Sequence, residues 1–338
     1  MNLNILYIFY KKFSNLIIKT YRYILFFIIS SLLFLSYNKN LFHKIIRSIS
    51  SDDINTLKTK ICLCTVGKKE NKYIKEYVEH YKAFGVDKIF LYDNNDVNGE
   101  KFEDILSEYI KSSFIEIFNF RGKIAPQLKI YGECYNKHKN DYDWFIFFDT
   151  DEFIHLNNYL NIKDFLNEKK FKKCKLIYFN CVRHTDNDKL FYENAPLKKR
   201  FPLILWNSSM YTLKTILRGK EDKKIRATTT HWINRRLKGG CDVFGKEVIP
   251  TQKVRLGKKI NNPIYKMYYI DHYSFKSTEE YINKINKGDG IYGYNNRTKL
   301  HKINLYFGYN KITAEKIKYI ENKTGLKLDK FKLMLDKK

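Results

Sequence analysis

The chain has 338 residues, which is enough for one large domain or two. Aromatic residues make up 16% of it and aliphatic residues are plentiful, so a chain that is disordered throughout is excluded. The formal net charge of +27 predicts attraction to polyanions, among them nucleic acids, anionic lipids and nucleotide phosphates, but it identifies none of them.

The N-terminal region predicts a membrane anchor. Residues 23–36 carry no charge, and flanking tyrosines with a snorkelling arginine extend this apolar segment to a marginal span over residues 21–37. A cleaved signal peptide fits less well, because no small-x-small site follows; an interfacial helix is the alternative. We expect a single-pass anchor within residues 1–47, in the ER or Golgi of a eukaryote or the inner membrane of a bacterium. Residues 48–57 then form a stem.

Strands and helices alternate through the next part of the chain. Strands are predicted over residues 61–66, 88–92, 114–120 and 144–148, and helices over residues 71–84, 102–110 and 126–139. Helices of this length between strands imply right-handed crossovers and a parallel sheet. The later part is less regular, with strands predicted over residues 175–179 and 265–270 and helices over residues 278–287 and 313–322. The economical interpretation is one α/β domain over residues 58–338.

Three carboxylates follow the buried strand at residues 144–148. Residues two apart on an extended chain point the same way, so Asp149 and Asp151 are expected on one face and Glu152 on the other, in a structural role. Two carboxylates aimed together repel each other unless a cation lies between them, and oxygen ligands favour magnesium or manganese bound with phosphates. The alternative is a strand that simply ends in an acidic turn.

The six cysteines predict neither a disulfide framework nor a zinc site. Cys62 and Cys64 lie two apart on one predicted strand, where a bridge between them is geometrically poor. The other four cysteines are scattered without zinc-like spacing. We expect most of them to be small buried residues, with one pair bridged if the domain is lumenal.

Several segments of the chain together resemble a known family. They are "CTVGKKENKYIKEYVEHYKAFGVDKIFLYDNN", "PQLKIYGEC", "WFIFFDTDEFI", "NDKLFYENAPLKKRF", "LKTILRG" and "IDHYSFKSTEEYINKINKGDG". In this order, from about Ile61 to Gly290, they resemble glycosyltransferase family 92 and the family 2-like enzymes of GT-A fold. The long first segment and the His-Tyr-x-x-Lys-Ser element are fairly specific, whereas Asp-x-Asp alone is not.

This resemblance implies a fold, an activity and partners. The GT-A fold is Rossmann-like, with a mostly parallel central sheet flanked by helices. The implied activity is transfer of a sugar, with galactose from UDP as one common case, from a nucleotide-diphosphate donor. The acceptor would be a glycan, glycoprotein or glycolipid, and the cofactor a divalent metal, Mn²⁺ ahead of Mg²⁺. The competing hypothesis is a basic protein that binds nucleic acid or anionic membrane without catalysis. It leaves the carboxylates and the ordered motifs unexplained, so we expect no nucleic-acid partner.

The resemblance also implies site residues. The predicted metal ligands are Asp149, Asp151 and His272, and the predicted donor-binding residues are Thr65, Gly67, Glu70, Asp93, Gln127, Lys214 and Lys276. Structural alternatives remain open: Asp93 can be a turn residue, Glu70 a first-turn helix carboxylate, and His272 a core histidine.

An inverting transfer also needs a general base for the acceptor hydroxyl. Asp186 and Asp188 are the predicted candidates, with Asp186 favoured and with Glu152 and Asp242 behind them. The stretch from Cys181 to His184 departs from the family pattern, so the acceptor stays open.

Overall fold

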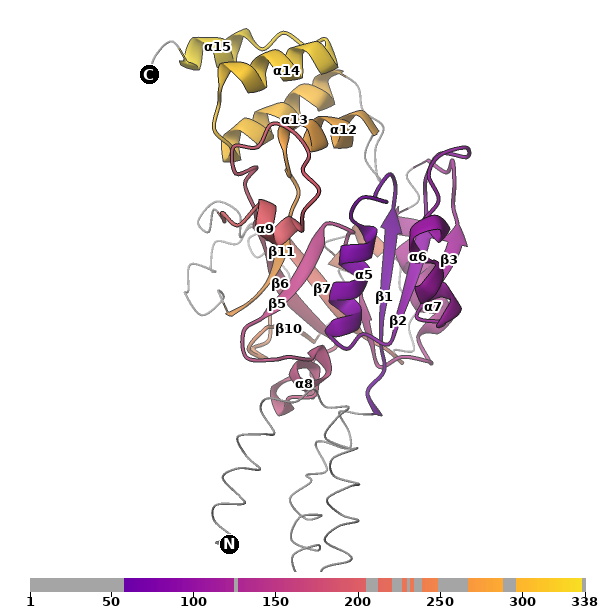
Figure 1. Ribbon diagram of the computed structural model, residues 1–338. Coiled ribbons are helices and arrows are strands. Elements are labelled where there is room, and N and C mark those ends of the chain that lie inside the picture. Colours follow the sequence, from indigo (N-terminus) through magenta and orange to yellow (C-terminus); the bar gives the residue numbers. More distant parts are fainter. Residues whose placement is uncertain are drawn as a thin grey trace, which may run out of the picture. The chain divides into compact units, whose positions relative to one another are not determined.

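The computed structural model describes residues 58–124, 127–204, 212–220, 227–229, 232–233, 239–248, 267–287 and 296–335. The predicted anchor and stem lie outside these residues. Within the described ranges, no helix combines the length and the apolar character needed to cross a bilayer. Residues 59–338 form one compact unit (Figure 1).

A mixed nine-stranded sheet is the centre of this unit, as far as the described residues show. Its order is β3-β2-β1-β4-β7-β6-β11-β5, with β10 beside β6, and a two-stranded sheet pairs β8 with β9. The strands are β1 (Ile61–Gly67), β2 (Lys88–Asp93), β3 (Ile115–Asn119), β4 (Trp144–Ile146), β5 (Glu152–Leu156), β6 (Leu176–Arg183), β7 (Thr212–Arg218), β8 (Ala227–Thr229), β9 (Trp232–Ile233), β10 (Gly240–Asp242) and β11 (Tyr268–His272). Strands β1 to β4 are parallel, as predicted, whereas β7 is antiparallel to both of its neighbours.

The helices fall into two sets. Earlier helices cover the two faces of the sheet, and the helices near the C-terminus form a group of their own. They are α5 (Ile74–Ala83), α6 (Glu103–Lys111), α7 (Gln127–His138), α8 (Ile162–Leu166), the 3-10 helix η1 (Lys169–Phe171), α9 (Leu197–Arg200), α12 (Thr278–Lys287), α13 (Asn296–Tyr309), α14 (Ala314–Thr324) and α15 (Asp329–Leu335). The predicted α/β class is therefore confirmed.

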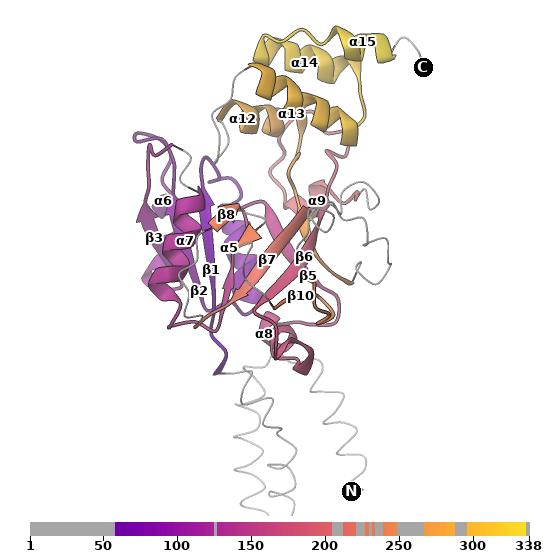
Figure 2. The same cartoon turned by 180° about the vertical axis from the view of Figure 1, so that it is seen from behind.

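Alternation along β1 explains the two layers. Ile61 and Leu63 belong to the apolar core that α5 and α6 cover, whereas Cys62 and Cys64 belong to the core that α7 covers. Helix α5 lies in front of the strands in Figure 1 and behind them in Figure 2. A strand that is buried on both faces has a continuous apolar sequence, and this is why β1 could be predicted from the sequence.

Helices α12 to α15 lie side by side (Figure 2), and their buried apolar residues form a core of their own. Buried polar contacts join α12 of this group to α9 and to the start of α5. Arg200 Nη1 donates to Glu280 Oε2 at 2.8 Å, and the Tyr73 hydroxyl donates to Glu280 Oε1 at 2.6 Å. All three residues are buried, so these hydrogen bonds to Glu280 compensate for lost hydration.

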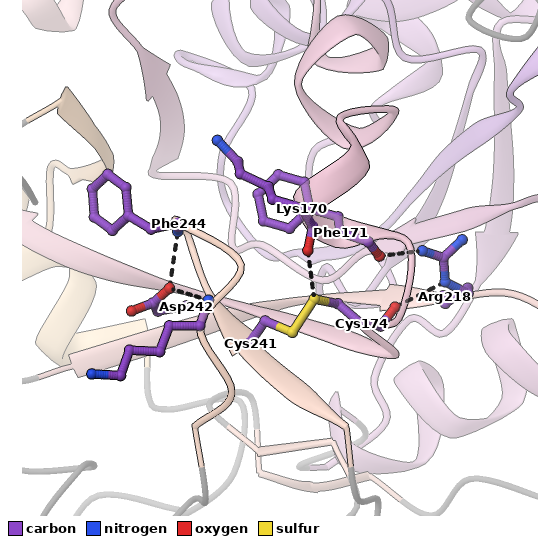
Figure 3. Close-up of a disulfide and its surroundings, with 8 residues drawn as sticks. Lys170, Phe171, Cys174, Arg218, Cys241, Asp242 and Phe244 are labelled. Atoms are coloured by element: carbon purple, nitrogen blue, oxygen red, sulfur yellow. Dashed lines mark hydrogen bonds between the residues drawn. A yellow bond between two sulfur atoms is a disulfide. The ribbon is translucent and has the colours of Figure 1, made fainter. Parts of the chain in front are cut away.

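Two disulfides correct the prediction of at most one bridged pair. Cys64 on β1 is bonded to Cys134 on α7, and Cys174 is bonded to Cys241 on β10 (Figure 3). Cys62 is free and buried. The partners are 70 and 67 residues apart in sequence. Helix α7 packs on β1, and Cys174 lies just before β6, which pairs with β10, so spacing alone does not reveal the bonds.

Arg218 fastens the loop beside the second disulfide (Figure 3). Its Nε donates to the Cys174 carbonyl at 2.9 Å and its Nη2 to the Phe171 carbonyl at 2.8 Å. On the other side, the Asp242 carboxylate accepts from the backbone N–H of Phe244 at 2.9 Å and closes a turn. Asp242, a minor candidate for the general base, therefore has a structural contact.

His80 on α5 predicts acid sensitivity. Its Nε2 is buried without a hydrogen-bond partner, and burial lowers the pKa of the imidazole to about 4. Between pH 6.5 and 4 the unfolded chain therefore binds a proton that the folded chain does not, so stability is full above pH 6.5 and falls as the pH drops. From pH 7 to pH 5 we expect a loss of about 2 kcal/mol from this group.

Urea unfolding at pH 7 and pH 5 measures this loss. His80→Phe is the informative variant, because it keeps the ring that stacks on Phe84 and removes the titrating group. The variant should lose less stability between the two pH values than the wild type. An identical loss in both proteins would assign the acid sensitivity to other groups.

Candidate functional site

The chain turns sharply between Asp149 and Glu152. Strand β4 ends at Ile146, so the two residues do not lie on one extended strand. Glu152 N donates to the Asp149 carbonyl at 3.0 Å, and Asp149 N donates to Glu152 Oε2 at 3.0 Å. Lys214 Nζ contacts Asp149 Oδ2 at 2.7 Å and Glu152 Oε2 at 3.0 Å. The prediction that Glu152 faces away from Asp149 is therefore wrong, because strand alternation does not apply within a turn.

Three side chains hold the Asp149 carboxylate. Its Oδ1 accepts from Gln127 Nε2 at 2.6 Å and from the Tyr131 hydroxyl at 3.1 Å, both on α7, while Oδ2 accepts from Lys214 on β7. Burial raises the pKa of Asp149, but the ammonium of Lys214 outweighs this effect and holds the pKa below its usual value. Asp149 is therefore ionised and fixed in orientation.

Asp151 lies beside His272. Strand β11 runs antiparallel to β5 with His272 opposite Glu152, which places His272 Nε2 at 3.5 Å from Asp151 Oδ1. Lys284 on α12 donates to Asp151 Oδ2 at 2.6 Å. Burial raises the pKa of Asp151, but Lys284 and then His272 outweigh it and hold the pKa well below the usual value. Burial lowers the pKa of His272, so its ring is neutral at pH 7.

Asp151 and His272 suit a divalent cation. Adjacent ligands of an ion at about 2.1 Å lie roughly 3 Å apart, which is close to the separation of Asp151 Oδ1 and His272 Nε2. A neutral imidazole and an ionised carboxylate are the forms that bind metals. Lys284 is the counter-ion of Asp151 in this structure.

A second group of potential ligands lies nearby. Glu152, Cys181 and His272 each place one donor atom within 4.8 Å of the others, the one such group among the described residues. It suits a cation less well, because the Lys214 ammonium lies at 3.0 Å from Glu152 and burial raises the pKa of the Cys181 thiol.

Glu70 is the centre of a lysine cluster. Lys276 Nζ lies at 3.4 Å from Glu70 Oε2 and over the Tyr73 ring, and Lys287 donates to Glu70 and to the Lys68 carbonyl. Burial raises the pKa of Glu70, but Lys276 and Lys287 outweigh it and hold the pKa below its usual value. Lys276 adopts a left-handed φ of 55°, which a non-glycine residue rarely does and which recurs at functional sites.

The ends of β1 and β2 have well-defined structural contacts. Asp93 Oδ1 accepts from Asn95 N at 2.8 Å and Oδ2 accepts from Arg121 Nε at 2.8 Å, which is the turn arrangement left open by the sequence. A Cβ at Gly67 would come within 2.6 Å of the Phe102 ring, so the glycine permits close packing. Thr65 is fully buried within β1. Donor contacts by these residues stay predictions.

The two candidates for the general base lie beside α13 and α14. Asp186 is 1% exposed; it accepts from the Tyr306 hydroxyl and lies at 2.6 Å from Lys316 Nζ. The Asp188 side chain is 59% exposed and lies at 3.1 Å from the same ammonium. These contacts give Asp186 a structural role, and the assignment of a base to Asp186 or Asp188 stays a prediction.

Comparison with known proteins identifies the family. Residues 58–305 match the model of glycosyltransferase family 92. The chain belongs to glycosyltransferase family 92. The resemblance inferred from the sequence is thereby confirmed.

Family 92 proteins of plants share part of this chain. One from Ricinus communis is 30% identical over 109 residues, which are 31% of this chain and 19% of the relative. One from Arabidopsis thaliana is 27% identical over 103 residues, which are 29% of this chain and 17% of the relative. The matched segments thus span about a fifth of these relatives' length.

Among solved structures, this family 92 chain is similar to S. aureus TarS. TarS 1-349 in complex with UDP-GlcNAc is 13% identical, with 79% of this chain and 80% of that chain covered and a TM-score of 0.36. TarS 1-349 in complex with UDP is 15% identical, with 47% of each chain covered and a TM-score of 0.32.

Sequence reasoning missed two lysines of this family 92 site. Lys284 and Lys287 lie three residues apart on α12 and contact Asp151 and Glu70, respectively. Their spacing places them on one face of α12, and α12 is the first helix after the His-Tyr element in the sequence. That spacing was the signal that could have found them.

Proposed function

We propose that this chain is a glycosyltransferase that moves a sugar from a nucleotide-diphosphate donor to a glycan, glycoprotein or glycolipid. Family membership supports the reaction class. The observation that carries the proposal is the convergence of Asp149, Asp151 and His272 just beyond the carboxyl end of β4. In open sheets with parallel strands, this edge is where ligands bind. The same argument supports a GT-A assignment for the mixed sheet.

A divalent cation, Mn²⁺ ahead of Mg²⁺, would bind at Asp151 and His272, with Asp149 held next to them by Lys214. Such an ion neutralises a departing diphosphate and makes it a better leaving group. Lys276, on the Glu70 cluster, supplies an ammonium of the kind that pairs with phosphate oxygens. Gln127 orients Asp149 through its amide.

The finer assignments belong to the same proposal. The donor sugar is galactose carried by UDP, the transfer inverts configuration, and a base at Asp186 or Asp188 takes the acceptor proton. The alternative function, binding of anionic membrane or nucleic acid without catalysis, rests on the net charge of +27 and on the 27 tyrosines, which can stack on bases.

We also propose that residues 21–37 anchor the protein in a membrane and that the catalytic domain lies in an oxidising compartment. The apolar character of that segment supports the anchor. The two disulfides support the compartment, because such bonds persist in the ER lumen, the periplasm and outside the cell.

A donor screen tests the proposed function. The melting temperature of the full chain would be measured with Mn²⁺ and a panel of nucleotide sugars, each repeated with EDTA. A ligand at 100 times its Kd stabilises the folded state by about 2.7 kcal/mol, so the matching donor should raise the Tm by several degrees. EDTA should remove the shift. If no nucleotide sugar shifts the Tm or is hydrolysed with Mn²⁺, the enzyme proposal fails, and DNA binding that survives Asp151→Ala would support the alternative.

A further inference from the structure

Glu152 lies against two of the predicted metal ligands, Asp149 and His272. Its side chain is fully buried. Oε2 accepts from Asp149 N at 3.0 Å and lies at 3.0 Å from Lys214 Nζ, which in turn donates to Asp149 Oδ2 at 2.7 Å. One oxygen of Glu152 is therefore committed to fixing Asp149.

The other oxygen faces the histidine. Glu152 Oε1 lies at 3.7 Å from His272 Nδ1, and within the described part of the chain neither atom has a hydrogen-bond partner. The opposite ring nitrogen, Nε2, lies at 3.5 Å from Asp151 Oδ1. The ring of His272 thus stands between two carboxylates, with one nitrogen turned to each.

The register of the sheet maintains this arrangement. His272 pairs directly with Glu152 across the antiparallel β5–β11 ladder, and Tyr273 N donates to the Asp151 carbonyl at 3.0 Å. Directly opposed residues on such a ladder have their Cβ atoms about 5 Å apart. The contact therefore follows from backbone pairing and does not depend on a flexible loop.

A histidine that binds a metal through one nitrogen almost always donates its other N–H to a carboxylate, a carbonyl or water, which fixes the ring and its tautomer. We propose that Glu152 is a positioning residue: its Oε1 accepts the Nδ1 proton of His272 and so presents Nε2, beside Asp151, to the divalent cation. This inference rests on the proposed function, since that function supplies the cation. The sequence had assigned Glu152 a structural role and a minor candidacy for the general base, not contact with a metal-binding histidine.

Mn²⁺ affinity of the full chain tests the inference without any turnover. Glu152→Ala is expected to weaken Mn²⁺ binding 10- to 100-fold, as measured by calorimetry. Glu152→Gln keeps an oxygen that can accept from Nδ1, so it should retain more affinity than Glu152→Ala. Equal losses in the two variants, or wild-type affinity in Glu152→Ala, would overturn the positioning role.

Glu280→Gln is the matched control. Glu280 is also a buried carboxylate with a cationic partner, Arg200, but it has no contact with His272 or Asp151 among the described interactions. It should leave the Mn²⁺ Kd unchanged, whatever it does to stability. A loss in this variant equal to that in Glu152→Ala would mean that the effect is general destabilisation.

Two further measurements separate this inference from the proposed function. If His272→Ala and Asp151→Ala abolish Mn²⁺ binding while Glu152→Ala does not, the inference alone fails. If the wild type binds no Mn²⁺, the metal proposal fails and the inference with it. Nitrogen NMR of the wild type saturated with Mg²⁺ needs no variant: His272 should carry its proton on Nδ1, and a proton on Nε2 would contradict the role of Glu152.

Discussion

Asp151→Ala is expected to abolish Mn²⁺ binding and to lower metal-dependent turnover of the nucleotide sugar by at least about 100-fold. Asp151 supplies the oxygen donor beside His272 Nε2, and no other described carboxylate oxygen is paired with that nitrogen. A bound cation contributes several kcal/mol to stabilising charge in the transition state, and every 1.36 kcal/mol corresponds to a factor of ten. Steady-state hydrolysis of the preferred donor with Mn²⁺ measures the loss.

The fold should survive this substitution. Removing Asp151 leaves Lys284 without its carboxylate, but the Lys284 side chain is 37% exposed, so it is not left as a fully buried, unpaired charge. Circular dichroism and the Tm should therefore stay near the wild-type values. A collapse of the fold would make the activity loss uninformative, and Asp151→Asn, which keeps the shape of the side chain, is then the variant to measure.

Asp143→Ala is the control at the other end of β4. Asp143 precedes β4 at its opposite end and, like Asp151, pairs with a lysine: Lys220 Nζ lies at 2.9 Å from Asp143 Oδ1. Its loss should leave donor turnover and Mn²⁺ binding unchanged. Equal activity in Asp151→Ala and the wild type would contradict the proposed site.

The parallel part of the fold could be predicted because its signals are local. The apolar run of β1 and the spacing of buried residues on α5 each lie within about ten residues. The end of β4 was harder to predict. The sequence predicted a strand to residue 148, because Phe147 and Phe148 are apolar and fully buried, but strand pairing stops at Ile146. The sequence shows burial directly and hydrogen bonding only indirectly.

Strands β5 and β7 were missed for a different reason. Strand β7 contains Lys214, which breaks the apolar pattern. Lys214 is nevertheless fully buried, because its ammonium lies at 2.7 Å from the ionised Asp149 and at 3.0 Å from Glu152. Strand β5 is defined by its pairing with β11, more than 110 residues later. Neither a buried ion pair nor pairing with a strand far along the chain produces a recognisable pattern within a short window of sequence.

The candidate site also contains residues that the sequence could predict and residues whose roles it could not. Asp149, Asp151 and His272 came from motifs, and the structure places them in one region. The roles of Lys284 and Glu152 depend on how α12 and β11 lie against the turn after β4. These contacts are tertiary, so the sequence alone could offer the residue types but not their partners.

Loss of the disulfides is expected to be the largest stability effect in the molecule. The Cys174–Cys241 and Cys64–Cys134 bonds close loops of 67 and 70 residues, and the chain-entropy relation gives about 4 kcal/mol for each. Cys174→Ala with Cys241→Ala should therefore lower the Tm by about 10 °C. Calorimetry with and without dithiothreitol measures the change in Tm. Cys62→Ala is the control: Cys62 is a free buried cysteine, so this variant should respond to dithiothreitol as the wild type does. If dithiothreitol leaves the wild-type Tm unchanged, the bonds do not form.

The two bonds should differ in their effect on activity. Cys134 lies on α7, the helix whose Gln127 and Tyr131 hold the Asp149 carboxylate, whereas Cys241 lies on β10, beside β6. At a temperature where both double variants remain folded, Cys64→Ala with Cys134→Ala should lose donor turnover, because α7 is then free to shift relative to Asp149. Cys174→Ala with Cys241→Ala should retain it. The opposite order would mean that α7 is fixed by packing alone and that Asp149 does not depend on the bond.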